Sequence, residues 1–160
     1  MQLAITSPSR ASSGWPGWIW SGPPVPRSPS ALHRGQRLTP RPRHGLGAYF
    51  GEGAALWDDP QLVRDDALAA AVIDAMGSSN AVVMRGNGLV VAADSLPEVV
   101  SLTWYLEDAA RLELAVRGAG LQDASAVLDA AECERRATRA GGIFERMWDY
   151  LTAGDPELAV

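Results

Sequence analysis

The strongest constraint on the fold is one continuous pattern, "NAVVMRGNGLVVAADSLPEVVSLTWYLEDAARLEL". It contains two short β-branched runs, "AVVM" and "LVVA", on either side of a turn that includes Asn87-Gly88. Asn-Gly between apolar runs favours a hairpin, because both residues tolerate the positive φ angles of a type I′ turn. A helix should follow at once, since Ser95 and Glu98 have the spacing of a capping box and Pro97 suits the first helical turn.

Further helices surround this hairpin in the sequence. The helix after it has an apolar face and should end near Gly118 or Gly120; the face comprises Val99, Leu102, Leu106, Ala110 and Leu114. Upstream, "DDPQLVRDDALAAAVIDAMG" predicts an amphipathic helix with a core face of Leu62, Leu68, Val72 and Ile73. Downstream, two shorter helical pieces are broken at Gly141-Gly142. The order predicts a layered α/β (α+β) domain whose antiparallel sheet is covered by helices.

The charges and prolines divide the chain into two parts. Residues 1–51 contain six arginines and no acid, whereas the remainder has eight arginines and all 19 acids. Eight of the 11 prolines precede His44. We therefore expect a disordered Pro/Arg/Trp-rich leader over 1–37 and a folded domain over 38–160. The leader arginines are scattered without a helical face, so we do not expect nucleic-acid binding.

The compartment follows from what the sequence does not contain. It has no run of about 18 apolar residues, so no membrane partner is expected. The N-terminus has no basic stretch followed by a clean apolar stretch, so no secretory signal is predicted. Cys133 is the only cysteine and cannot form an internal disulfide. A cytoplasmic protein is the natural expectation.

Three residues stand out as functional candidates, each with a structural alternative. His44 could act in acid–base chemistry or bind a carboxylate, or it could be a hydrogen-bonded loop histidine. Arg85 could hold a substrate carboxylate bidentately, or it could be a solvated charge beside a hairpin. Asn87 could contact substrate, or it could serve the turn alone. Cys133 lies in a charged segment without a nearby histidine, so a nucleophilic role is not expected.

Residues from about 41 to 151 resemble the class II aldolase/adducin-like family, nearest its decarboxylase-like branch. The resemblance is carried by "VVMRGNGLVVAADSLPEVVSLTWYLEDAARLEL", by "PRPRHGLGAYFGEGAALWDDP" and by "FERMWDYL". In that family a strand, an Arg-Asn-His-Gly turn, a second strand and a long helix follow one another. The resemblance implies the layered fold and a partial domain, because only the C-terminal two-thirds of the family pattern is matched.

The resemblance also implies a divalent metal, zinc or iron, held by three histidines. One of these belongs to the turn and two form an upstream His-x-His pair, with a catalytic glutamate further upstream. Asn87 stands at the turn ligand's position, and residues 1–51 contain only His33 and His44 and no acid. An amide oxygen is a poor transition-metal ligand beside imidazole. We therefore expect that no residue of this chain ligates the family metal and that the metal is not retained.

Two functions follow as hypotheses. The first is a metal-dependent carbon–carbon lyase, an aldolase or decarboxylase acting on a small oxygenated or aromatic acid, with His44, Arg85 and Asn87 in its pocket. The second is a catalytically inactive, truncated or divergent family member with a structural role or none of its own. The resemblance further implies a small-molecule substrate and a homo-oligomer.

Overall fold

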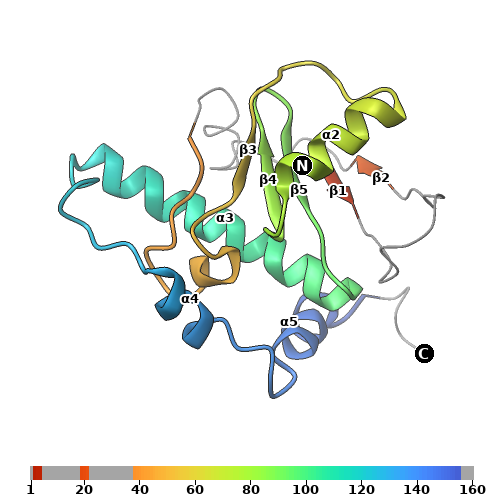
Figure 1. The fold of residues 1–160 in the computed structure, drawn as a ribbon. Coiled ribbons are helices and arrows are strands. Elements are labelled where there is room, and N and C mark those ends of the chain that lie inside the picture. The colour runs from red at the N-terminus through yellow and green to blue at the C-terminus, as the bar shows by residue number, and fades with distance from the viewer. Residues whose placement is uncertain (1, 5–18, 22–37, 156–160) are drawn as a thin grey trace.

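The computed structural model describes residues 2–4, 19–21 and 38–155. Its main sheet has three strands in the order β3 (Ala55–Trp57), β4 (Ala81–Met84) and β5 (Gly88–Val91). β4 and β5 form the expected antiparallel hairpin, whereas β3 pairs with β4 in parallel. The parallel pair arises because helix α2 (Asp66–Met76) carries the chain back from the end of β3 to the start of β4. The sheet is therefore mixed, and its antiparallel part is the hairpin (Figure 1).

The hairpin lies between two layers of apolar side chains. Ala81 and Val83 of β4 face helix α3 (Leu96–Gly118), and the alternate residues Val82 and Met84 face α2. Every residue of β4 and β5 is buried, with exposed fractions between 0% and 8% where the side chain is hydrophobic. A strand buried on both faces reads as a continuous apolar run rather than an alternating one, which explains "AVVM" and "LVVA". The layered α/β fold is thus confirmed.

Helix α3 begins as its sequence predicts. The Ser95 side chain accepts a hydrogen bond from the Glu98 N–H at 3.3 Å, and Pro97 lies in the first turn. The Glu98 carboxylate reaches back one residue further than a capping box requires, to the N–H of Asp94 at 3.4 Å. The helix ends at Gly118. Its N-terminus is therefore held by two side chains that were recognisable from spacing alone.

The turn of the hairpin differs from the predicted type I′ turn. The Asn87 N–H donates to the Met84 carbonyl at 3.1 Å, so Arg85 and Gly86 are the central residues. Gly86 has a positive φ angle, 81°, and so does Gly88, 144°, which pairs with Met84 at the start of β5. The connection is three residues long, from Arg85 to Asn87, and Asn87 is its last residue rather than a central one. The Asn87 side chain points to the loop that contains Pro60 and Gln61. This three-residue form is the next most common hairpin loop.

Helix α2 is shorter than predicted. It begins at Asp66, because the Asp65 side chain caps the Leu68 N–H at 2.8 Å. Asp59 accepts from the Gln61 N–H at 2.8 Å, forming a separate local turn at Pro60. The predicted core role of Leu62 was wrong: its side chain is 56% exposed, in the loop before the helix.

In the C-terminal part of the described chain, α5 (Ile143–Thr152) lies against α3 and α4 (Ala130–Arg136) lies against the short helix η1 (Gly47–Phe50). Helices α4 and α5 are separated at Gly141-Gly142, as predicted, and Gly142 adopts a left-handed conformation. Helix η1 also packs beside α3. In Figure 1, α4 and α5 lie below α3, while the β4–β5 turn lies at the upper end of the sheet.

Two short strands fall within the predicted leader. β1 (Gln2–Ala4) and β2 (Ile19–Ser21) pair with each other in an antiparallel arrangement. The rest of 1–37 lies outside the described residues, so the leader and the domain boundary near Leu38 stay predictions. In the described ranges, no helix combines the length and the apolar character needed to cross a membrane.

Candidate functional site

Arg85 lies at the β4–β5 turn and faces the loop after β3. Its Nε donates to the Asp58 carboxylate, and its Nη2 lies 3.4 Å from the Asp58 carbonyl oxygen. The side chains of Arg85 and Asp58 are 30% and 37% exposed. The predicted carboxylate-binding residue therefore already has a carboxylate partner within the chain.

Asn87 holds the same loop one step further along. Its Nδ2 donates to the carbonyls of Pro60, at 3.2 Å, and Gln61, at 2.7 Å. The Arg85 N–H also donates to the Trp57 carbonyl at 2.9 Å. Together the turn residues bind the segment 57–61 from both ends. The Asn87 side chain therefore serves to connect the turn to this loop.

His44 belongs to a different part of the structure. Its Nε2 lies 2.8 Å from the Asp108 carboxylate on α3. An ionised carboxylate only accepts hydrogen bonds, so Nε2 is the donor. The other ring nitrogen, Nδ1, is shielded from solvent without a hydrogen-bond partner in the described structure.

The structure does not bring His44 together with Arg85 and Asn87. His44 precedes η1, and the Tyr49 carbonyl of η1 accepts from the Asn80 side chain at 3.2 Å, just before β4 begins. Arg85 follows the other end of β4, so about five residues of extended chain, roughly 16 Å, separate the two regions. Arg85 and Asn87 form one site, and His44 with Asp108 forms another.

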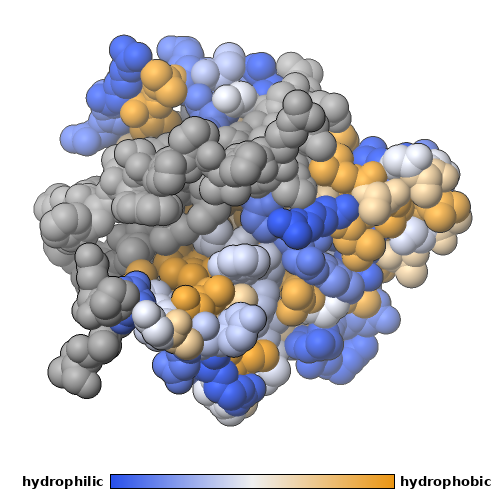
Figure 2. Space-filling view, turned by 180° about the vertical axis from the view of Figure 1, so that it is seen from behind, coloured by the Kyte–Doolittle hydropathy of each residue, from blue (hydrophilic) through white to orange (hydrophobic). Residues whose placement is uncertain are grey.

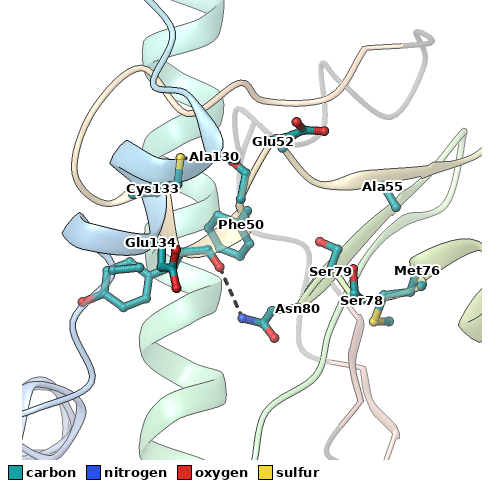
Figure 3. Close-up of a pocket in the computed structure, with 16 residues that line it drawn as sticks. Phe50, Glu52, Ala55, Met76, Ser78, Ser79, Asn80, Ala130, Cys133 and Glu134 are labelled. Atoms are coloured by element: carbon teal, nitrogen blue, oxygen red, sulfur yellow. Dashed lines mark hydrogen bonds between the residues drawn. The ribbon is translucent and has the colours of Figure 1, made fainter.

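A cavity of about 650 Å³ opens between η1, the end of α2 and α4 (Figure 3). Phe50 and Met76 contribute apolar surface, and Asn80 is bound to the η1 backbone at its floor. Its charged lining residues in the described structure are Glu52 and Glu134. None of the three predicted site residues lines it. With two carboxylates and no arginine, this cavity disfavours an acidic ligand.

Cys133 lines the same cavity but is engaged by the backbone. Its side chain is 2% exposed, and its Sγ lies 3.3 Å from the Gly51 carbonyl oxygen. Burial raises the pKa of the Cys133 thiol, and the nearby charges of Asp129, Glu132 and Glu52 raise it further. A nucleophilic thiol needs the opposite environment, so the geometry agrees with a structural role.

The structure contains a buried ion-pair network that the sequence did not predict. Glu113 of α3 is fully buried, and its two oxygens each lie 2.7 Å from a guanidinium Nε, one of Arg43 and one of Arg117. Arg43 also donates to the carbonyls of Ser125, at 2.6 Å, and Gln122, at 3.1 Å. The Glu113–Arg117 spacing of four residues was a visible signal, but Arg43 is 70 residues away and carried none. This network joins the segment before η1 to the C-terminal half of α3.

The described residues do not fit a zinc or iron ion. Across 2–4, 19–21 and 38–155, no three His, Cys, Asp or Glu side chains converge as a metal site requires. Asn87 directs its amide nitrogen, a donor, to two carbonyls, and His44 is bound to Asp108. His33 lies outside the described residues.

Comparisons with known proteins agree with this fold. A family described as "Class II Aldolase and Adducin N-terminal domain" matches residues 28–114, which include the β4–β5 turn. No curated protein matches the sequence. A solved structure of an L-fuculose 1-phosphate aldolase is similar with a TM-score of 0.60 and 19% identity, over 69% of this chain and 50% of that one. An aldolase II superfamily protein from Pseudomonas syringae has a TM-score of 0.59 and 18% identity, over 78% and 51% respectively. The chain thus spans about half the length of these proteins.

Proposed function

The chain belongs to the class II aldolase and adducin family, and from that premise we propose that it is an aldolase-like carbon–carbon lyase acting on a small oxygenated or aromatic acid. The observation that carries the proposal is the family match over residues 28–114, which includes the turn that presents Arg85 and most of α3. The L-fuculose 1-phosphate aldolase supports the same reaction class by its fold.

In this proposal Arg85 binds the substrate carboxylate. A guanidinium offers a planar pair of N–H donors that matches a carboxylate, and Arg85 is partly exposed at the end of the sheet. Asn87 beside it positions the turn and contacts the substrate. His44, held by Asp108, is the proposed acid–base residue. Because β4 lies between the two regions, the His44 proposed to act beside Arg85 is that of a second copy.

The family's divalent metal would polarise a substrate carbonyl. Since the described residues do not fit it, its ligands would have to come from elsewhere. This is the observation that supports the second candidate, a catalytically inactive family member. In that candidate the turn has a structural role only, because the side chains of Arg85 and Asn87 form hydrogen bonds to residues 58–61.

One experiment separates the two candidates. The purified full chain is analysed for bound metal with and without added Zn²⁺, Fe²⁺ or Mn²⁺, and is assayed for cleavage of small hydroxy and aromatic acids. Tight stoichiometric metal and a cleavage activity that Arg85→Gln abolishes would support the lyase. Arg64→Gln, which removes an exposed arginine before α2, is the matched control. A chain that binds no metal and cleaves nothing supports the inactive member.

Self-association is part of the proposal. Hydrophobic residues gather at the projecting C-terminal end of α3 on the face shown in Figure 2. Leu121, three residues after the end of α3, is 51% exposed. Trp104 is also 51% exposed on α3. A surface on which several apolar side chains lie together favours association. Size-exclusion chromatography that gives a monomer at all concentrations would contradict this point.

A further inference from the structure

The arginine proposed to bind substrate is already bound to an acid of its own chain. We propose that Asp58 is a built-in carboxylate that occupies the Arg85 guanidinium and that a substrate carboxylate binds by displacing it. This inference rests on the proposed role of Arg85. It makes Asp58 a residue that sets affinity and selectivity at that position.

The contacts place Asp58 at one edge of the Arg85 guanidinium where a ligand carboxylate can bind. Arg85 uses one edge of its guanidinium, Nε and Nη2, toward Asp58. That edge is one that can hold both oxygens of a ligand carboxylate. A ligand that approaches the same edge meets the Asp58 carboxylate, and two like charges cannot share it without a cost. Binding at the Nε side of that edge and the Asp58 side-chain contact are therefore mutually exclusive.

The backbone around Asp58 is held, so a rotation of the Asp58 side chain would release the Arg85 Nε, while Nη2 stays 3.4 Å from the Asp58 carbonyl oxygen. The preceding residue, Trp57, pairs with Met84 in the sheet and accepts from the Arg85 N–H at 2.9 Å. The following residues, Pro60 and Gln61, are bound by the Asn87 amide. With both ends fixed, the Asp58 side chain can swing away while the 57–61 segment stays in place. Asn87 thereby holds the loop beside Arg85 in place when the Asp58 side chain rotates away.

The partial exposure of the pair limits what displacement costs. Side chains that are 30% and 37% exposed interact through a medium close to water, so the pair is weak. Loss of Asp58 should improve ligand affinity by two- to fivefold, where fivefold corresponds to about 1 kcal/mol. A neutral carbonyl compound gains less from Arg85 than the Asp58 carboxylate does. The internal acid therefore selects for ligands that carry a full negative charge.

The test measures carboxylate binding rather than turnover. The full chain labelled with ¹⁵N is titrated with benzoate and glycolate while the arginine Nε–H resonances are followed, and benzamide is the uncharged probe. Asp58→Asn should bind benzoate two- to fivefold more tightly than the wild type, and Arg85→Gln should abolish binding. Benzamide should bind neither protein. Circular dichroism checks that each variant is folded. If Arg85→Gln does not fold, Arg85→Lys takes its place, because it keeps the positive charge but lacks the planar pair of donors.

Asp59→Asn is the matched control, since it removes the same charge one residue away. Its amide oxygen can still accept from the Gln61 N–H, so the local turn is kept. Benzoate affinity in Asp59→Asn should equal that of the wild type. Equal affinities in Asp58→Asn and wild type, or equal gains in the two variants, would overturn the proposal. So would a gain that persists in the Asp58→Asn/Arg85→Gln double variant. Arg85-dependent binding without cleavage would refute the lyase and leave the role of Asp58 standing.

Discussion

Replacement of Glu113 tests whether the buried ion pairs stabilise the fold. Its carboxylate is fully buried and receives one hydrogen bond from Arg43 and one from Arg117. The Arg43 side chain is only 1% exposed, whereas that of Arg117 is 31% exposed. Glu113→Ala would leave the Arg43 guanidinium buried with two carbonyl partners and no counter-ion. Arg117 can turn toward water and should suffer little.

The expected cost follows from that uncompensated charge. Breaking a buried ion pair by removing one partner typically costs about 3–5 kcal/mol, a large part of the roughly 5–15 kcal/mol that stabilises a domain. The free energy of unfolding is measured by urea denaturation, with tryptophan fluorescence as the signal. The double variant Arg43→Met/Glu113→Leu should recover most of the loss, because apolar residues of similar volume need no counter-ion. Arg111→Ala, at an exposed position of α3, is a control for helix propensity.

A loss below about 1 kcal/mol in Glu113→Ala would refute the reasoning, as would a double variant less stable than the single one. The pH dependence provides a second check. Burial alone would raise the pKa of Glu113, but the hydrogen bonds and charges of Arg43 and Arg117 outweigh burial and hold that pKa below its usual value. Its stabilisation is therefore complete above the unfolded pKa, about 4.3, and is lost as pH falls through the folded pKa. Glu113→Gln should lack this acid-sensitive component.

Four further outcomes test other parts of the structure. Ser95→Ala should lower the free energy of unfolding by about 1 kcal/mol in urea titrations, because it removes the α3 N-cap, and Ser95→Thr should restore most of it. Leu102→Ala should cost about 2–5 kcal/mol by the same measurement, since Leu102 is fully buried, and a smaller cost would contradict a tightly packed core. Asn87→His should keep the fold by circular dichroism yet bind no stoichiometric zinc, because the described residues offer no companion ligands; zinc found by metal analysis would show that ligands exist elsewhere. Cys133 should react slowly with a thiol reagent at pH 8 in the native protein and quickly in urea, because burial raises the pKa of its thiol; equal rates would contradict its burial.

Local sequence determined the elements that depend on neighbouring residues. The hairpin followed from two β-branched runs around a glycine-containing turn, and α3 from a cap, a proline and apolar residues at helical spacing. The break at Gly141-Gly142 followed in the same way. Each of these signals acts within four or five residues, through φ preference or a hydrogen bond along the chain. These elements can therefore be predicted from the sequence without knowledge of the rest of the fold.

The candidate site was predicted residue by residue but not as an arrangement. The resemblance to a family singled out the turn with Arg85 and Asn87, and His44 upstream. Whether these residues meet depends on the direction in which β4 runs between them, which no local pattern states. The structure places Arg85 and Asn87 at one end of that strand and η1, which His44 precedes, beside the other end.

Tertiary structure alone decided the partners of the polar side chains. Arg85 meets Asp58 across 27 residues and Arg43 meets Glu113 across 70, in both cases because separate elements pack together. The parallel β3–β4 pair has the same origin, because it depends on α2 returning the chain to the start of β4 beside β3. An ionic or hydrogen-bonded contact needs two groups within about 3 Å, and for distant residues that distance is a property of the whole packed fold. The sequence thus determined which polar residues are candidates for ligand binding, while packing decided which of them already have a partner within the chain.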